Sequence, residues 1–495
     1  MSTFQKKEFD EFQVRRMGLG LIACLIGVVA VIFALKSDNR MLMALAVGVP
    51  LTIPFISNLS AIYIFSAWVG VLGLSLPGMA ELELNLLFHV LLVGVCFLQT
   101  LMRVPGSESK GPVVAKRALW CFLAVVVALM GVRGSGLRVL GASTWGGATY
   151  IFLIVSILFF LGVVPRLKIS SGQLKSLVWG LLVAGVVASA LQRSGFLQML
   201  QERTFQVVRL AWLIPLITVT LPLVLALRLR KFLQYPLLAL CLLLVSLAGF
   251  RSKLVGLIMV IGFFLFCRSR QKGRFFSFSI AAGLVFWGFL IVASSHFPLS
   301  MQRAVSFIPF THVDAIVERE AMNTVEWRIE IWNYGWADFH KYWLVGRGVA
   351  FDVYDFVSKM GNELGMGLQS TYFAYLGHVY HSGPVTLLVD YGVPGAALFF
   401  GFMISAGSFM VKQIKRIMYV DTFEARYVLF LCVSLLWQFV AFWLVFGDSL
   451  GLGRMVMQFA LILILLPLTV EKRSVNDGEM PSSKANLIGG DRRFW

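Results

Sequence analysis

The stretch from His381 to Gly395, HSGPVTLLVDYGVPG, combines two ionisable side chains with small residues at helical spacing. It begins where a polar segment gives way to an apolar one, which predicts the mouth of a membrane helix with His381 at the water-facing end. Asp390 lies about two and a half turns below it, inside the apolar run, where a carboxylate is costly and usually functional. Gly392 and Gly395 share a helix face and predict close helix packing. The pattern indicates a histidine that accepts a proton near neutral pH.

Two neighbours add to this stretch. Ser382 follows the histidine, and His378 stands one helical turn earlier, where it could orient His381 or contact a substrate. Judged by position alone, His381 is more often an interfacial residue that only caps a helix. The aspartate below it and the polar segment before it shift the balance toward function.

Arg251 and Lys253 lie in GFRSK, a tight turn between two apolar segments. A pair of cations at the level of the outer lipid headgroups suits a phosphate or pyrophosphate group. The alternative is an arginine at a helix end that extends its side chain to the interface.

Arg328 is the third candidate, in TVEWRIEIW, one turn before Trp332. Glu326 and Glu330 flank it and offer the alternative of a local ion pair on a solvated helix face.

The elements that must position these residues are membrane helices, because hydrophobic residues make up 58% of the chain and charged residues only 14%. The mean hydropathy is +0.82. The net charge of +18 does not indicate nucleic-acid binding, because positive residues gather in short loops that alternate along the chain. The six cysteines lie in or beside apolar segments, which predicts neither a disulfide framework nor a cysteine metal site. The first span follows KKEFDEFQVRR and is expected to be a retained helix rather than a cleaved signal.

The expected fold class is an all-α polytopic membrane protein, GT-C-like, with about 14 transmembrane helices and one large extracytoplasmic loop. The division is 1–295 for about 11 spans, 296–380 for the periplasmic loop, 381–470 for about 3 spans, and 471–495 for a disordered cytoplasmic tail. Both termini are placed in the cytoplasm. The predicted spans are 17–35, 41–56, 60–77, 84–101, 118–132, 144–165, 176–191, 207–227, 232–249, 253–267, 275–295, 383–410, 427–446 and 451–470. The second and third could instead form one re-entrant hairpin.

The large loop has its own pattern. Its first part has helical spacing, with Asp314 as the expected N-cap, and Gly346 and Gly348 then predict a turn. Aromatic residues recur along it, which suits either packing at the membrane interface or stacking on sugar rings.

Together these elements resemble the O-antigen ligase and O-antigen polymerase superfamily of bacterial membrane glycosyltransferases. The resemblance covers roughly 245–410. It rests on an arginine-serine pair at the start of a span (Arg251), an arginine followed by a tryptophan and a Gly-x-Gly turn (Arg328), and the His-Ser, nine-residue, Gly-x-x-Gly stretch beginning at His381. Two positions depart from the family pattern: Phe250 stands where serine is common, and His378 is one residue further from His381 than the usual second histidine.

The resemblance implies transfer of a glycan from undecaprenyl pyrophosphate to an acceptor hydroxyl on the outer face of the inner membrane, without a metal or other cofactor. His381 would be the general base, and Arg251 and Arg328 would bind the pyrophosphate. Asp390, Lys253, His378, Ser382 and Trp332 would support them. The acceptor would be another lipid-linked glycan in a polymerase or a lipid A core in a ligase; a protein hydroxyl is a third option. Membrane lipids and a chain-length regulator are further expected partners.

Two competing functions remain. A flippase for lipid-linked oligosaccharides would have a similar helix count, but such transporters are commonly built from repeated halves, and the two halves of this chain do not match. A non-catalytic assembly subunit would give His381 and Arg251 no purpose.

Overall fold

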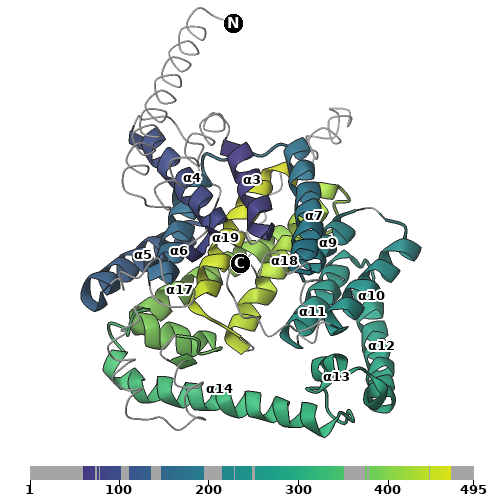
Figure 1. Cartoon of the computed structure of the whole chain (residues 1–495). Helices are drawn as coiled ribbons and strands as arrows, with labels where there is room; N and C mark the ends of the chain where they lie inside the picture. Colours follow the sequence, from purple (N-terminus) through teal and green to yellow (C-terminus); the bar gives the residue numbers. More distant parts are fainter. Residues whose placement is uncertain are drawn as a thin grey trace, which may run out of the picture.

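The computed structural model describes residues 59–72, 75–76, 79–101, 111–134, 147–193, 214–227, 229–247, 251–349, 374–375, 378–444 and 446–469 (Figure 1). Within these ranges the regular secondary structure is helical except for a short antiparallel hairpin of β1 (Ser75–Leu76) and β2 (Met79–Glu83). The sequence predicts a span over 60–77, but α3 ends at Leu72 and the hairpin follows. The pair Pro77–Gly78 lies between the strands in sequence and favours a turn over a helix.

Apart from the early end of α3, the helices follow the predicted spans closely, because runs of apolar residues of membrane-crossing length leave the backbone no other way to satisfy its polar groups. They are α3 (Leu59–Leu72), α4 (Leu84–Leu101), α5 (Val113–Arg133), α6 (Gly147–Leu158) with a π-helical turn at Phe159–Val163, α7 (Ser171–Arg193), α9 (Ile214–Ala226), α10 (Lys231–Leu247), α11 (Arg251–Arg268), α12 (Lys272–Ala293), α17 (Gly383–Ile417), α18 (Phe423–Leu444) and α19 (Ser449–Leu465).

Six of the described helices are long and apolar enough to cross a membrane: α5, α7, α12, α17, α18 and α19. Shorter apolar helices accompany them, and the whole is a multi-pass α-helical membrane protein. The predicted spans at 17–35 and 41–56 and the tail at 471–495 lie outside the described residues, so the total of fourteen stays a prediction. The re-entrant alternative for 41–56 and 60–77 also stays open.

A row of aromatic rings forms the centre of the bundle. Phe122 of α5 packs on Phe399 of α17, with 5.3 Å between ring centroids, and Phe399 packs on Phe402 one turn later at 5.4 Å. Phe459 of α19 continues the row at 5.8 Å from Phe402, and Phe160 stacks on it at 5.6 Å. All five side chains are almost completely buried. This packing makes α17 the central helix of the fold, so the residues at its beginning have a rigid support.

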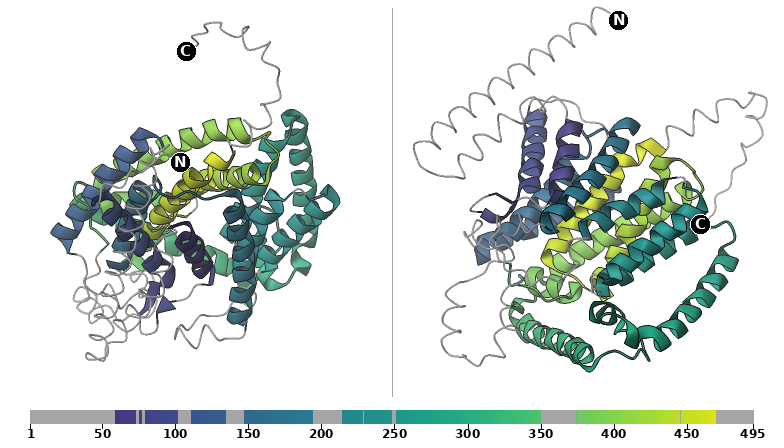
Figure 2. Two further views of the ribbon diagram at one scale, coloured as in Figure 1. Left: turned by 90° about the horizontal axis from the view of Figure 1, so that it is seen from above. Right: turned by 45° about the vertical axis from the view of Figure 1, so that its right-hand side comes forward.

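The predicted large loop contains two helices, α13 (Leu299–Val305) and α14 (Ala315–Tyr342). The carboxylate of Asp314 accepts a hydrogen bond of 2.8 Å from the backbone N–H of Ile316, which confirms the expected N-cap of α14. Helix α14 lies across one end of the bundle in both views (Figures 1 and 2) and packs against α13 and α17. At Gly335 the two helices come so close that an added Cβ would lie 2.8 Å from the side chain of Val385.

A small second core joins α14 to the start of α17. Its buried members are Ile331, Tyr375, Tyr380, Val385 and Val389, and two tryptophans of α14, Trp327 and Trp332, pack against them. Burial of this aromatic surface holds α14 against the bundle end at which α17 begins. The other end of α17 carries Lys415 and Arg416.

Candidate active site

His381 lies immediately before α17, between the second core and the loop that joins α18 to α19. Its ring centroid is 5.2 Å from that of Trp327 and 4.6 Å from that of Phe446. The residue is half-buried, and its Nδ1 atom is buried without a hydrogen-bond partner among the described residues. Burial, and after it the positive charge of Arg328, lowers the pKa of His381 to about 4, while the carboxylate of Asp448 acts in the opposite direction. The imidazole is therefore neutral at pH 7 and can accept a proton.

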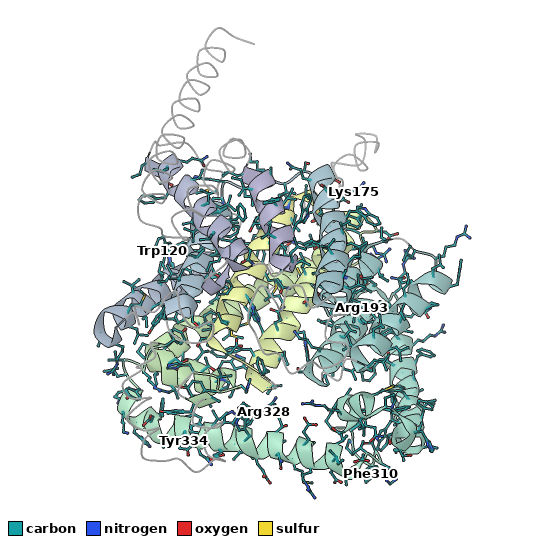
Figure 3. The ribbon with its side chains drawn as sticks, viewed as in Figure 1. Trp120, Lys175, Arg193, Phe310, Arg328 and Tyr334 are labelled. Carbon is teal, nitrogen blue, oxygen red and sulfur yellow. The ribbon has the colours of Figure 1, made fainter. Side chains whose placement is uncertain are left out.

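Arg328 lies on the side of α14 that faces the bundle (Figure 3). It is half-buried, and its Nε is likewise buried without a hydrogen-bond partner in the described part of the chain. Burial lowers its pKa. A buried donor without a partner costs about 1–3 kcal/mol. Two such groups from different elements, close enough to interact electrostatically, form a site that suits a polar, negatively charged ligand.

The start of α11 contributes to the same region. Helix α11 begins at Arg251, but the side chain of Arg251 lies outside the described part of the structure. Lys253, two residues later, interacts electrostatically with Asp448 and Arg454. Asp448, just before α19, also acts on His381, so the same carboxylate acts on Lys253 and on the histidine. The predicted convergence of Arg251 with the other two residues stays a prediction.

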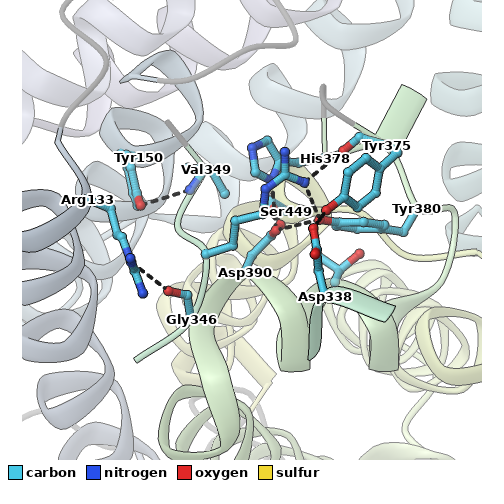
Figure 4. Close-up of polar contacts among 12 residues, drawn as sticks. Arg133, Tyr150, Asp338, Gly346, Val349, Tyr375, His378, Tyr380, Asp390 and Ser449 are labelled. Carbon is cyan, nitrogen blue, oxygen red and sulfur yellow. Dashed lines mark hydrogen bonds and ion pairs between the residues drawn. The ribbon is translucent and has the colours of Figure 1, made fainter. Parts of the chain in front are cut away.

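Asp390 is completely buried, and its carboxylate accepts three hydrogen bonds (Figure 4). His378 Nδ1 lies 2.7 Å and the Tyr380 hydroxyl 3.1 Å from Oδ1, and the Ser449 hydroxyl lies 3.0 Å from Oδ2. The sequence pattern pairs Asp390 with His381 along one helix, and the structure corrects this: the histidine bound to Asp390 is His378. The reason is that His378 and His381 both have positive φ, 59° and 52°, so the chain turns before α17 and is not helical through them.

Arg347 supplies a positive charge to this buried group. Its Nη1 donates to the Tyr380 hydroxyl at 3.2 Å and to the carbonyl of Tyr375 at 3.1 Å. Burial alone would lower the pKa of Arg347, but Tyr380 and Asp390 outweigh it and raise the pKa. Tyr375 in turn donates to Asp338 of α14. The charged network thus joins α14, the Gly-x-Gly segment and α17.

Gly346 and Gly348 bring this segment against a break in α17. At Gly392, φ is 68° and the helical conformation is interrupted, two residues before Pro394. The broken backbone finds partners in the segment: Gly348 N–H donates to Asp390 O at 2.9 Å, and Val393 N–H to Trp343 O at 2.7 Å. A Cβ on Gly346 would lie 2.5 Å from Asp390 O, so only glycine allows this approach. Irregular backbone within an apolar helix is tolerated because the protein itself satisfies it.

Helices α5 and α6 hold the other side of the segment. Arg133 Nε donates to Gly346 O at 3.1 Å, and the Tyr150 hydroxyl accepts the Val349 N–H at 2.9 Å (Figure 4). The segment is therefore fixed from both sides, and α17 keeps its bend.

The structure also shows the surroundings of the other residues that the sequence predicts for the site. Trp332 Nε1 donates to the carbonyl of Tyr380 at 2.8 Å, next to His381 in the chain. Ser382 is the N-cap residue of α17, but its side chain makes no capping hydrogen bond. An added Cβ on Gly395 would lie 3.5 Å from Val125 of α5, in van der Waals contact. Gly392, predicted to serve helix packing, instead provides the positive φ of the bend.

Comparison with known families identifies part of the chain. Residues 236–400 match the family model of the O-antigen ligase. This match covers less than half of the chain and supports its resemblance to the O-antigen ligase and polymerase superfamily. No curated protein matches it. The matched O-antigen ligase region includes Arg251, Arg328, His381 and Asp390, and it indicates an activity of the ligase or polymerase type.

Several residues of the candidate active site were not identified by sequence reasoning. Arg347 stands between the two glycines of the predicted turn, where only the glycines carried a signal. Trp327 directly precedes Arg328, and its aromatic contact with His381 has no periodic signature. Phe446 and Ser449 lie beyond residue 400, outside the matched region. The one available signal was the position of Asp448–Ser449 at the start of an apolar span, a typical N-cap.

Replacing Gly392 by alanine is expected to abolish most transfer activity and to lower the melting temperature in detergent. The positive φ is strained for alanine, by about 1–3 kcal/mol, and its Cβ would lie 2.8 Å from the carbonyl of Leu344. Gly401→Ala on the same helix is the control, because nothing lies within 4 Å of its added Cβ. Equal melting temperatures for the two variants would contradict the assigned bend.

Proposed function

We propose that the protein is a glycosyltransferase that moves a glycan from undecaprenyl pyrophosphate to an acceptor sugar hydroxyl at the periplasmic face of the bacterial inner membrane. The observation that carries the proposal is the pairing of His381 with Arg328. Both are half-buried at the bundle end covered by α14, both have a nitrogen without a partner among the described residues, and the positive charge of Arg328 acts on His381.

In the proposed reaction, the oxygen of the acceptor hydroxyl attacks the anomeric carbon of the donor glycan. The hydroxyl proton passes to the neutral imidazole of His381. The bond between the anomeric carbon and the pyrophosphate oxygen breaks, and undecaprenyl pyrophosphate leaves with the electron pair. Arg328, with Arg251, stabilises the charge that develops on the leaving group.

The low pKa of His381 in the free protein fits this sequence of events. The positive charge of Arg328 lowers it, and a bound pyrophosphate would place negative charge beside both groups. A nearby anion favours the protonated imidazole. Donor binding would therefore raise the pKa of His381 toward neutral pH, where a general base is most effective.

No metal is needed in this proposal, because pyrophosphate is already a capable leaving group and the arginines supply positive charge. Among the described residues, no group of three or more histidine, cysteine, aspartate or glutamate side chains is placed to hold a metal ion. Metal independence is a prediction that a chelator tests.

The proposed orientation follows from the distribution of charge between the two ends of the bundle. At the end away from α14, Arg268 binds Asp421 at 2.6 Å, and Lys415 and Arg416 lie in the last turn of α17. Basic residues concentrate on the cytoplasmic side of membrane proteins. This distribution supports an orientation in which α14 and the site of His381 face the periplasm.

The test is transfer by the purified protein in proteoliposomes, with an undecaprenyl-pyrophosphate-linked glycan as donor. Core-only lipopolysaccharide and a second lipid-linked glycan serve as alternative acceptors and separate ligase from polymerase. We expect a longer glycan, release of undecaprenyl pyrophosphate, and no effect of EDTA. Movement of the donor between leaflets without a new glycosidic bond would instead indicate a flippase. Activity that EDTA removes and a divalent ion restores would contradict the metal-free mechanism.

A further inference from the structure

The loop between α18 and α19 reaches the same site although it lies outside the matched region 236–400. We call residues 446–449, Phe-Gly-Asp-Ser, the 446–449 segment. Phe446, Asp448 and Ser449 contact or act on residues of the candidate active site, and Gly447 packs on the first turn of α17. Its beginning is fixed by a hydrogen bond of 2.8 Å from the N–H of Phe446 to the carbonyl of Ala441.

Gly447 fastens the segment to the first turn of α17. A Cβ at this position would lie 2.5 Å from the backbone N and Cα of Gly383. The two backbone segments touch here because each has a glycine at the point of contact. The Thr386 hydroxyl donates to the carbonyl of Gly447 at 3.3 Å. The segment therefore has a defined position relative to His381, which precedes this turn by two residues.

Asp448 and Ser449 connect the segment to the charged groups. Asp448 accepts the N–H of Gly451 at 2.6 Å and so caps α19, and its carboxylate acts on both His381 and Lys253. Ser449 donates to Asp390 at 3.0 Å. These bonds fix the segment at its second end as well.

Phe446 is the exposed member of the segment. Its ring centroid is 4.6 Å from that of His381, at an angle of 40° between the planes, and 38% of the residue stays exposed. The other aromatic neighbour of His381, Trp327, comes from α14 and directly precedes Arg328, the proposed donor-binding residue. The imidazole of His381 thus has two aromatic neighbours. Trp327 lies on α14 with the proposed donor-binding residue, and Phe446 lies on the 446–449 segment with part of its surface exposed.

A reaction at His381 requires two sugars, one on the donor and one on the acceptor. A pyranose has apolar C–H faces that pack on aromatic rings, and a fixed ring beside the base would place an acceptor hydroxyl within its reach. We propose that the open surface of Phe446 is an acceptor-sugar subsite, on which the acceptor pyranose stacks with its hydroxyl toward His381. Arg328 remains at the place of the donor pyrophosphate. This inference rests on the proposed function.

The test separates acceptor binding from donor binding in the proteoliposome assay described above. Phe446→Ala is expected to raise the KM for the acceptor that the wild-type protein uses by about 3- to 10-fold, because one aromatic contact is lost. The KM for the lipid-linked donor should not change. Phe446→Trp should keep the acceptor KM within about twofold of the wild type, because it keeps a stacking surface. The control is Phe276→Ala on α12, an equally apolar side chain that is 61% exposed.

Phe446→Leu distinguishes stacking from simple packing against His381. Leucine fills the space but offers no ring, so stacking predicts an acceptor KM as high as that of Phe446→Ala. Recovery of a normal acceptor KM in Phe446→Leu would overturn the subsite, and so would an equal rise of the donor KM in the alanine variant. If only this inference is wrong, His381→Ala still abolishes transfer while the Phe446 variants bind acceptor normally. If the proposed function is wrong, the wild-type protein itself forms no new glycosidic bond in this assay.

Discussion

Replacing His381 by alanine is expected to reduce glycan transfer by roughly 10²–10⁴-fold, the usual contribution of a general base. Donor binding should stay nearly intact, because the pyrophosphate is held by arginines rather than by the imidazole. The measurements are initial transfer rates in proteoliposomes and binding of the lipid-linked donor, followed by quenching of tryptophan fluorescence. Trp327 lies 5.2 Å from His381 and next to Arg328, so it should report on occupation of the site.

The matched control is His312→Ala, which removes an exposed histidine whose backbone, not its side chain, binds Ser294. Its transfer rate should equal that of the wild type. Undiminished transfer by the His381 variant would remove this histidine from the mechanism. Loss of donor binding together with transfer would instead assign His381 to the binding of pyrophosphate.

The same residue should set the acidic limit of activity. Burial and Arg328 lower the pKa of His381 to about 4, so the neutral, proton-accepting form persists as the pH falls well below the ordinary histidine value of about 6.5. The acidic limb of kcat/KM, which reports the free enzyme, should therefore lie below that value. Arg328→Gln should move the limb to higher pH because it removes a repelling cation, and Asp448→Asn should move it lower. Shifts in the same direction for both variants would contradict the assigned charges.

Much of the fold follows from the sequence because the bilayer restricts the choices of the chain. Apolar segments of membrane-crossing length form helices, and the described helices follow the predicted spans. Asp314 could be recognised as the N-cap of α14 because a cap is a local feature, set by residues within one turn. The Gly-x-Gly turn was equally readable, since positive φ restricts the residue type.

The partners within the site could not be read in the same way, because they are contacts between residues far apart in the chain. Asp390 and His381 have a plausible helical spacing, yet Asp390 binds His378 and Ser449. The spacing rule assumes a continuous helix, and the chain enters α17 through two residues of positive φ. Phe446 contacts His381 because Gly447 allows a close approach to Gly383. No local sequence pattern predicts this contact.

Replacing Asp390 by asparagine is expected to be the most destabilising conservative change in the site. The carboxylate accepts hydrogen bonds from His378, Tyr380 and Ser449 and balances the charge of Arg347. The amide group of asparagine would point a donor at these donors and remove one of the two carboxylates, Asp390 and Asp338, that act on the half-buried guanidinium. Breaking a buried charged pair costs about 3–5 kcal/mol, so the melting temperature in detergent and the yield of folded protein should both fall sharply.

Two further variants make this expectation specific to the buried network. Asp421→Asn breaks ion pairs with Arg268 and, at 3.6 Å, with Arg426, in which the carboxylate side chain is 43% exposed, and an exposed pair contributes only about 0–1 kcal/mol. This control should therefore melt near the wild type. Combining Asp390→Asn with Arg347→Gln removes both charges, and the double variant should be less destabilised than the sum of the two single variants. Strict additivity would show that Arg347 and Asp390 do not stabilise each other. In that case, the position of the Gly-x-Gly segment on α17 would depend on its backbone hydrogen bonds and glycine contacts alone.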